Sequence, residues 1–246
     1  VPVDNTVKAD DTLKAYKAIS ELYTALNSGN TDYEKLTEAA RPVTVRKTDI
    51  GFITVFSLPY EYENIIYSQK TGQVSNPYRS KSGWHIFKVI DERKAVGKWK
   101  VSQILLAMPP ETQAADKKLL EKKADSIYRL LQQGADFGLM ARQFSDDKLT
   151  YGNNGELAEF GSGKYELDFE KEVFSLSRDG ETGKPFLTNY GYHIVKRMSH
   201  SPVTADKNDQ AFLFELKQKL QQDSRINIAR VLFTKEVLKQ VNLKRT

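Results

Sequence analysis

The string Gly83-Trp84-His85-Ile86-Phe87-Lys88 returns 108 positions later as Gly191-Tyr192-His193-Ile194-Val195-Lys196. The chain contains only 3 histidines, and two of them occupy the equivalent place in this repeat. Self-similarity at a fixed spacing is typical of a duplicated structural unit. The sequence therefore predicts two copies of one small domain.

The match extends well beyond the string. In each copy an apolar stripe with helical spacing is followed by a glycine, and Gly/Pro-containing turns recur later in the same order. The paired segments are 15–26 with 120–131, 58–63 with 165–170, and 72–77 with 180–185. Each copy is expected to contain a long helix, a short helix, a turn-rich stretch, another short helix, a Gly/Pro turn and a final strand.

The ends of the two copies differ. A strand over residues 98–108 is predicted before the second copy, whereas only Val1-Pro2-Val3 stands at that place in the first. We therefore expect the opening strand of the first copy to lie outside this sequence. The predicted domains are residues 1–95, residues 98–199 and a helical segment over residues 200–246.

Two amphipathic helices are expected in this last segment, over residues 212–220 and 226–238. Asp223-Ser224 offers good N-cap chemistry for the second of them. The segment could pack on the second copy or begin a further domain.

Composition sets broad limits on function. At 246 residues and 39% hydrophobic content the chain can form two domains of about 100 residues. No stretch is apolar enough to span a membrane, and the absence of cysteine excludes thiol catalysis. The net charge of +5 would allow an acidic partner, but the lysines of 117–123 have no interleaved aromatic residues, which favours a solvated face over nucleic-acid binding.

The second copy resembles the parvulin-type peptidyl-prolyl cis/trans isomerases over almost all of residues 98–198. The motifs that carry the resemblance are residues 101–106, Ala135-Asp136-Phe137, Phe144-Ser145-Asp146-Asp147, residues 155–160, Phe169-Glu170 and residues 191–195. The first copy resembles the family more loosely, through residues 49–52, Leu58-Pro59, Tyr62-Glu63 and residues 83–86.

Two such units with flanking helices are similar to the envelope chaperone-isomerases of Gram-negative bacteria. The resemblance implies an α+β fold with two tandem parvulin-like domains, each a four-stranded antiparallel sheet surrounded by helices. The first domain would lack its opening strand, and a helical C-terminal segment would follow the second.

The resemblance also implies an apolar pocket for proline in the second domain. Leu157, Tyr165 and Phe169 match the family's proline-binding positions, and Phe160 lies close by in sequence. Leu157 and Phe169 could instead be ordinary core residues. Tyr165 replaces the more usual methionine or leucine, so its hydroxyl would need a partner.

The polar part of the implied site departs from the family pattern. His193 fits the last-strand histidine and Asp147 the acidic position, although Asp146 competes with it. Gln103 stands where the family's first-strand histidine is expected, and Tyr190 where it has serine. Gln103 can still donate to and accept from His193. Two alternatives give these residues no role in a site: His193 could be a core histidine, and Asp147 could be an exposed loop carboxylate.

The first domain matches the site less completely. Ile50, Leu58 and Tyr62 match the apolar pocket, and Ser82 and His85 match the serine and histidine. Residues 41–45 occupy the place of the acidic loop without supplying an acid. The first domain is therefore expected to bind peptide or to serve a structural role rather than to catalyse.

The barrier to rotation about a peptide bond is about 18–20 kcal/mol. Rotation breaks no covalent bond, so the implied site needs an apolar pocket and a few polar groups, with neither metal nor cofactor. The implied function is isomerisation and folding of proline-containing unfolded or extended polypeptides in the periplasm or cell envelope. The alternative is a non-catalytic chaperone that binds such polypeptides through degenerate parvulin domains.

Overall fold

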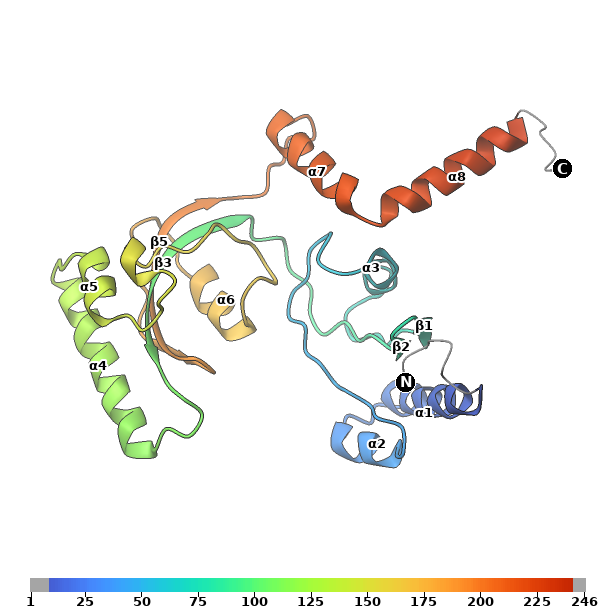
Figure 1. Ribbon diagram of the computed structural model, residues 1–246, viewed down its shortest axis with the longest axis horizontal. Coiled ribbons are helices and arrows are strands. Elements are labelled where there is room, and N and C mark those ends of the chain that lie inside the picture. The colour runs from blue at the N-terminus through green and yellow to red at the C-terminus, as the bar shows by residue number, and fades with distance from the viewer. Residues whose placement is uncertain (1–8, 241–246) are drawn as a thin grey trace. The chain divides into compact units, whose positions relative to one another are not determined.

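A computed structural model describes residues 9–240 of the chain (Figure 1). The prediction made for Val1-Pro2-Val3 lies outside the described residues. By its internal contacts the chain divides into two compact units, Lys94–Lys207 and Val1–Arg93 together with Asn208–Thr246. The division into domains 1–95, 98–199 and 200–246 remains a prediction.

The unit Lys94–Lys207, here called the second unit, contains a sheet with helices on both of its faces. Its elements are β3 (Lys98–Ala107), α4 (Ala114–Gln132), α5 (Phe137–Phe144), the short 3₁₀ helix η1 (Tyr151–Asn153), α6 (Leu167–Phe174), β4 (Phe186–Thr188) and β5 (Gly191–Ser201). The predicted long helix, two short helices and final strand are all present.

The sheet of the second unit is antiparallel, with strand order β3-β5-β4. The central strand β5 places His193 opposite Leu105 of β3 and Phe186 of β4. The expected fourth strand is represented by residues 156–160, which form only two isolated bridges with β3 and no regular strand. The reason is local, because the pairing register shifts by one residue between the two bridges, Ser102 with Glu156 and Trp99 with Phe160.

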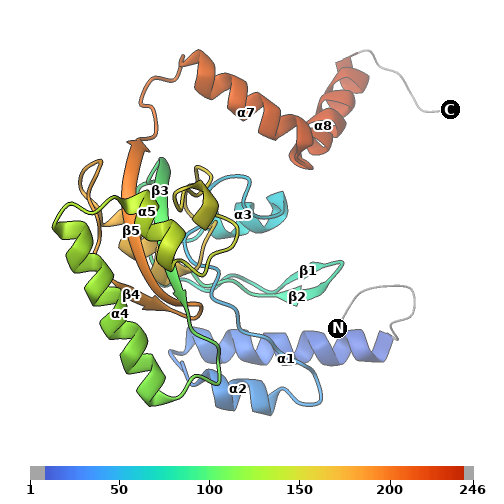
Figure 2. The same cartoon turned by 60° about the vertical axis from the view of Figure 1, so that its left-hand side comes forward.

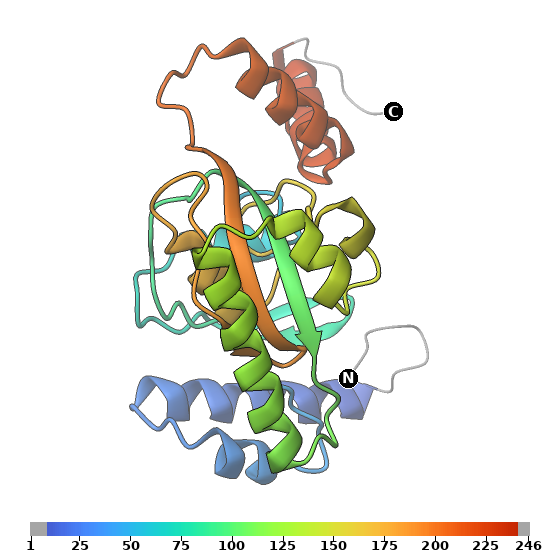
Figure 3. The ribbon, with the colours of Figure 1, turned by 90° about the vertical axis from the view of Figure 1, so that its left-hand side faces the viewer.

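The side chains of β3 and β5 contribute alternately to two separate hydrophobic cores, because successive residues of a strand point to opposite faces of the sheet. On one face Ile104, Leu106 and Ile194 pack against α4 and α5. On the other face Val101 and Val195 pack against α6. Figure 1 shows α4 and α5 on one side of the β3–β5 pair and α6 on the other, and Figure 3 shows α4 crossing the sheet.

The repeated glycine has a structural reason. Gly191 adopts a φ of 138°, and a Cβ atom there would overlap the carbonyl oxygen of Leu106 on β3. Gly83 has nearly the same φ, 133°, at the start of the equivalent strand. Only glycine combines this backbone conformation with such a close approach.

The other unit, here called the first unit, repeats part of this plan (Figure 2). Its elements before residue 94 are α1 (Ala9–Asn27), α2 (Tyr33–Ala39), α3 (Tyr60–Tyr67), β1 (Tyr78–Ser80) and β2 (Gly83–His85). The buried stripe of α1, formed by Ile19, Leu22 and Leu26, packs against Trp84 and Ile86. β1 pairs with β2 in the register in which β4 pairs with β5, because Tyr78 faces His85 as Phe186 faces His193.

The C-terminal segment forms the two expected helices, α7 (Gln210–Gln222) and α8 (Arg225–Gln240). Asp209 caps α7, and Asp223 accepts the backbone N–H of Arg225 at the start of α8. Contrary to the expectation that this segment packs on the second copy or begins a further domain, it groups with the first unit. The α+β class and the helical C-terminal segment are confirmed.

Within residues 9–240, none of the helices has the length and apolar character needed to cross a membrane.

Candidate functional site

A buried polar network crosses the sheet of the second unit. It consists of Thr188, His193, Gln103, Asp147 and Thr150. The Thr188 hydroxyl lies 2.8 Å from His193 Nε2, and His193 Nδ1 lies 3.2 Å from Gln103 Oε1. Gln103 Nε2 donates to Asp147 Oδ2 at 2.7 Å, and the Thr150 hydroxyl donates to the same oxygen at 2.5 Å.

These partners assign a direction to every bond in the polar network. Because Gln103 donates its amide N–H to Asp147, its Oε1 is an acceptor and His193 Nδ1 must carry the proton. His193 Nε2 is then free to accept from Thr188. A neutral histidine therefore satisfies both neighbours, whereas a second proton on Nε2 would require the Thr188 hydroxyl to turn from donor to acceptor.

Burial supports the same charge states. His193 is only 5% exposed. Burial lowers the pKa of His193 from 6.5 to about 4, although the charge of Asp147 acts in the opposite direction. Burial alone would raise the pKa of Asp147, but hydrogen bonds from Thr150, Gln103 and the Leu149 amide lower it overall. At neutral pH the network thus holds an ionised carboxylate beside a neutral imidazole.

The loop that carries Asp147 is fastened to β3. The Ser145 hydroxyl accepts the amide of Leu105, and the amide of Asp146 donates to the Leu105 carbonyl at 2.7 Å. The side chain of Asp146 accepts the backbone N–H of Ala107 at 2.9 Å, so it binds the end of β3. Of the two neighbouring aspartates, Asp147 is therefore the one that joins Gln103.

An aromatic cluster surrounds the His193 end of the polar network. It consists of Phe160, Tyr165, Phe169 and Phe186. Phe169 meets the imidazole of His193 edge to face at a centroid distance of 5.2 Å, and Phe186 stacks on it at 5.4 Å. Tyr165 lies 4.6 Å from Phe160 and 5.0 Å from Phe169. These edge and tilted arrangements are favourable for aromatic rings and form an apolar wall.

Tyr165 connects the aromatic cluster to the charged end of the network. Burial raises the pKa of its hydroxyl, and the negative charge of Asp147 raises it further. The geometric link between the cluster and the carboxylate runs through His193, whose imidazole contacts Phe169 and Phe186 and is joined to Asp147 by Gln103.

The structure places the sequence-predicted residues of the second domain in three ways. Gln103, Asp147 and His193 are joined by hydrogen bonds, whereas Tyr190 is 67% exposed and contributes only its backbone N–H, to the Thr188 hydroxyl. The remaining four predicted residues share the apolar side of the sheet: Leu157, Phe160 and Phe169 are buried, and Tyr165 is partly buried against them.

Sequence reasoning missed Thr188, Thr150 and Phe186. A signal for two of them existed, because the spacing of 108 places Thr188 on Ser80 and Phe186 on Tyr78. The hydroxyl that reaches His193 comes from the last residue of β4 instead of from the following turn. Thr150 carries no such signal, since its contact depends on the turn that begins at Asp147.

A buried glutamate holds the loop that presents Tyr165. Glu170 on α6 is only 2% exposed, and its Oε1 accepts the backbone N–H groups of Lys164 and Tyr165 at 2.8 and 3.0 Å. Hydrogen bonds to a carboxylate are stronger than those between neutral groups. Glu170 therefore fixes the position of Tyr165 relative to Phe169.

The first unit gathers a similar but neutral set of side chains around His85. Ser80, Tyr62 and Ser82 place their hydroxyls 2.7, 3.1 and 3.4 Å from His85 Nε2. Burial lowers the pKa of His85. Among the described residues, no carboxylate is hydrogen-bonded to this cluster. Leu58 is partly buried, whereas Ile50 is 46% exposed, so the pocket predicted there is only partly assembled.

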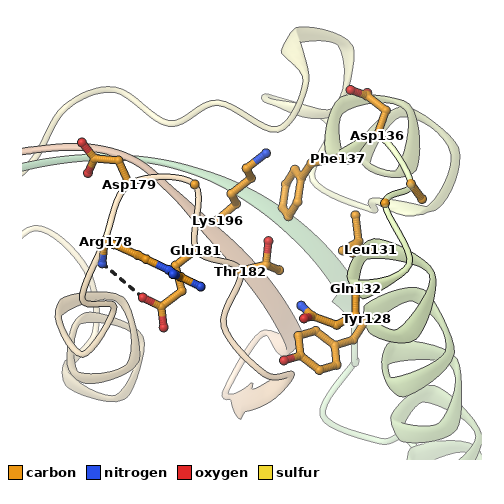
Figure 4. Close-up of a pocket in the computed structure, with 13 residues that line it drawn as sticks. Tyr128, Leu131, Gln132, Asp136, Phe137, Arg178, Asp179, Glu181, Thr182 and Lys196 are labelled. Atoms are coloured by element: carbon orange, nitrogen blue, oxygen red, sulfur yellow. Dashed lines mark hydrogen bonds between the residues drawn. The ribbon is translucent and has the colours of Figure 1, made fainter.

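A separate hollow of about 820 Å³ opens in the second unit between α4, the start of α5 and the turn at 178–182 (Figure 4). Its wall mixes Arg178 and Lys196 with acidic side chains, and Glu181 accepts the backbone N–H of Arg178. None of the predicted site residues lines it. The polar network and the aromatic cluster therefore form a different site.

No group of three or more His, Asp or Glu side chains within residues 9–240 could hold a metal ion.

Comparison with known families gives two matches to the same kind of domain. A family model described as the PPIC-type PPIase domain matches residues 86–200, and a second model with that description matches residues 2–91.

Curated relatives cover much of the chain. It is 27% identical over 212 residues to Chaperone SurA of Xanthomonas oryzae pv. oryzae, covering 82% of this chain and 45% of the relative. It is 29% identical over 172 residues to Chaperone SurA of Legionella pneumophila strain Lens, covering 67% of this chain and 39% of the relative. The chain thus spans less than half the length of these relatives.

Similar solved structures include the peptidylprolyl isomerase PrsA of Bacillus cereus, at 28% identity and a TM-score of 0.38. That match covers 61% of this chain and 52% of PrsA. NmPin, the parvulin of Nitrosopumilus maritimus, is 31% identical with a TM-score of 0.34, covering 42% of this chain and 97% of NmPin.

Proposed function

This chain belongs to the PPIC-type, or parvulin-type, peptidyl-prolyl isomerase family, and from that premise we propose that it isomerises X-Pro bonds in unfolded or extended polypeptides of the cell envelope. The observation that supports this most is the junction of the aromatic cluster with an ionised carboxylate in the second unit. The names of the curated relatives support a folding role, and a periplasmic location is part of the same proposal.

The aromatic cluster is proposed to receive the prolyl ring. Phe169 and Phe160 are buried and Tyr165 is only partly buried, so a ring that packs on Tyr165 would leave water without moving the core. Catalysis requires the twisted amide to be held better than the planar one. A pocket that fixes the ring while leaving the preceding residue free to rotate meets this requirement.

Asp147 is proposed to supply the electrostatic part. In the planar amide conjugation puts negative charge on the carbonyl oxygen, and twisting removes part of it. An ionised carboxylate facing that oxygen therefore raises the energy of the planar form relative to the twisted form. Gln103 and Thr150 hold the carboxylate, while neutral His193 backs the aromatic cluster.

A second function is favoured by the first unit. Its cluster around His85 has the hydroxyls of Tyr62, Ser80 and Ser82 but no hydrogen-bonded carboxylate among the described residues. We propose that this unit binds extended, proline-containing peptide without catalysing rotation. The chain would then combine one catalytic and one holding site.

The test is the isomerisation rate of a blocked Ala-Phe-Pro-Phe peptide, measured by NMR exchange with the full chain. Asp147→Asn is expected to lower the rate about tenfold or more, which corresponds to about 1.4 kcal/mol of transition-state stabilisation. Asp146→Asn is the matched control and should stay within about twofold. Phe169→Leu tests the aromatic cluster, with exposed Phe214→Leu as its control.

If the parent chain gives no acceleration yet suppresses aggregation of an unfolded client, the catalytic proposal is wrong and the holding function remains. If Asp146→Asn and Asp147→Asn are equally impaired, the role given to Asp147 is wrong.

A further inference from the structure

An arginine from the C-terminal segment is buried against the first unit. Arg225, at the start of α8, donates to Glu63 Oε2 at 2.9 Å and to Asp223 Oδ1 at 2.6 Å. Its guanidinium lies 4.1 Å from the ring centre of Phe56 and 5.0 Å from that of Tyr60. The side chains of Arg225 and Glu63 are only 14% and 3% exposed. This contact joins two side chains that are 162 positions apart in the sequence.

Glu63 links this arginine to the peptide site around His85. Its other oxygen, Oε1, accepts the backbone N–H of Leu58 at 3.0 Å. The adjacent Tyr62 places its hydroxyl on His85. Phe56, two residues before Leu58, adopts a φ of 72°, which a bulky residue keeps only when its surroundings hold it. One buried carboxylate thus ties together the loop, the helix and α8.

The equivalent glutamate of the second unit has different partners from Glu63. There Glu170 occupies the equivalent place and accepts two loop amides, of Lys164 and Tyr165, with one oxygen. In the first unit the carboxylate accepts one loop amide and the guanidinium instead. The same loop is therefore held from within its own unit in one copy and from the C-terminal segment in the other.

We propose that Arg225 is a positioning residue of the peptide site in the first unit, acting through Glu63 on the loop that carries Leu58. This rests on the proposed peptide binding by that unit. Without the guanidinium, Glu63 Oε2 would lose a charge-assisted hydrogen bond while remaining buried. The carboxylate would then hold the Leu58 amide less firmly.

The experiment is an NMR titration of the full ¹⁵N-labelled chain with the blocked Ala-Phe-Pro-Phe peptide. The amides of Ser80 and Gly83 report on the first unit, and those of Thr188 and Gly191 report on the second in the same tube. Arg225→Met keeps the length of the side chain and removes its charge. Arg225→Lys keeps the charge but lacks the planar set of donors that a guanidinium presents. Arg230→Met, at an exposed position on the same helix, is the matched control.

In Arg225→Met we expect the dissociation constant read at Ser80 and Gly83 to rise about tenfold, the loss typical of a charge-assisted hydrogen bond, and that read at Gly191 to be unchanged. Hydrogen exchange of the Leu58 amide should accelerate in parallel. Arg225→Lys should fall between parent and Arg225→Met, which keeps the proposal testable if the methionine variant unfolds the first unit.

Equal affinity at Ser80 and Gly83 in parent and Arg225→Met would overturn the positioning role, and so would an equal loss in Arg230→Met. A parent chain that shows no peptide-induced shift at these amides would refute peptide binding by the first unit itself.

Discussion

Acid should destabilise the second unit through His193 well before its carboxylates are protonated. In the unfolded chain His193 takes up a proton near pH 6.5, whereas in the folded unit burial lowers the pKa of His193 to about 4. Between these values the unfolded state binds more protons, so stability falls as pH falls. The sign follows from the burial of the imidazole, which disfavours its charged form in the folded unit.

The magnitude follows from the two pKa values. At about 1.4 kcal/mol for each tenfold change in proton affinity, the full effect below pH 4 is about 3 kcal/mol. At pH 5, where the folded ring is still neutral, the loss relative to pH 7.5 is about 2 kcal/mol. Asp147, whose pKa is lowered in the folded unit, stabilises above about pH 4 and loses its contribution only below that, so it adds little in this window.

The assay is urea unfolding at pH 7.5 and pH 5. The chain has 2 tryptophans, one in each unit, so a Trp84→Phe background leaves Trp99 to report on the second unit. His193→Gln should lose most of the pH dependence, whereas His85→Gln should keep it. A His193 resonance that titrates near pH 6.5 in the folded chain would refute the reasoning, as would equal pH dependence in parent and His193→Gln.

Three further changes test the supports of the site. Thr188→Val removes the donor to His193 Nε2 and should destabilise the second unit by about 1–3 kcal/mol in urea unfolding, with Thr188→Ser as the conservative rescue. Gly155→Ala places a Cβ against the carbonyl oxygen of Gln103 at a φ of 75° and should cost more stability than Gly152→Ala, which has open space. Glu170→Gln keeps an acceptor but loses the charge, and should weaken peptide binding in the second unit at unchanged fold, read from the Gly191 amide.

Each of these predictions has a result that contradicts it. Equal stability of Thr188→Val and parent would mean that the His193 bond contributes nothing. A tolerated Gly155→Ala would mean that residues 155–157 move away from β3 at little cost. Unchanged peptide affinity in Glu170→Gln would show that the loop is fixed by other contacts.

The duplication and the helix order could be predicted because both rest on local pattern. Apolar stripes at helical spacing and the Gly-aromatic-His string survive in each copy, and the structure gives β1–β2 the same register as β4–β5. The irregular segment 156–160 could not be predicted as two isolated bridges. The pairing register shifts by one residue between those bridges, and a sequence pattern does not encode such a shift.

The site was harder to predict than the fold. Neighbouring residues carry the same functional group, and only the folded geometry decides which of them joins the site. Asp146 and Asp147 are the same residue type and differ in their partners, because Asp146 accepts the Ala107 amide whereas Asp147 accepts from Gln103 and Thr150. Thr188 and Tyr190 both offer a hydroxyl, but Thr188 ends β4 and reaches His193, whereas Tyr190 lies in the turn that follows and is exposed. The catalytic roles remain predictions that the variants above can test.

The two buried glutamates hold equivalent loops in the two copies, but their hydrogen-bond partners differ. Glu63 and Glu170 both hold the loop before their helix, but only Glu63 has Arg225 as partner. A loop held within its own unit keeps its position whatever the C-terminal segment does, whereas the loop at Leu58 is tied to α8. If the second unit catalyses and the first holds, peptide release from the first can be altered through α8 without changing the isomerisation rate, and Arg225→Met is the variant that should separate the two quantities.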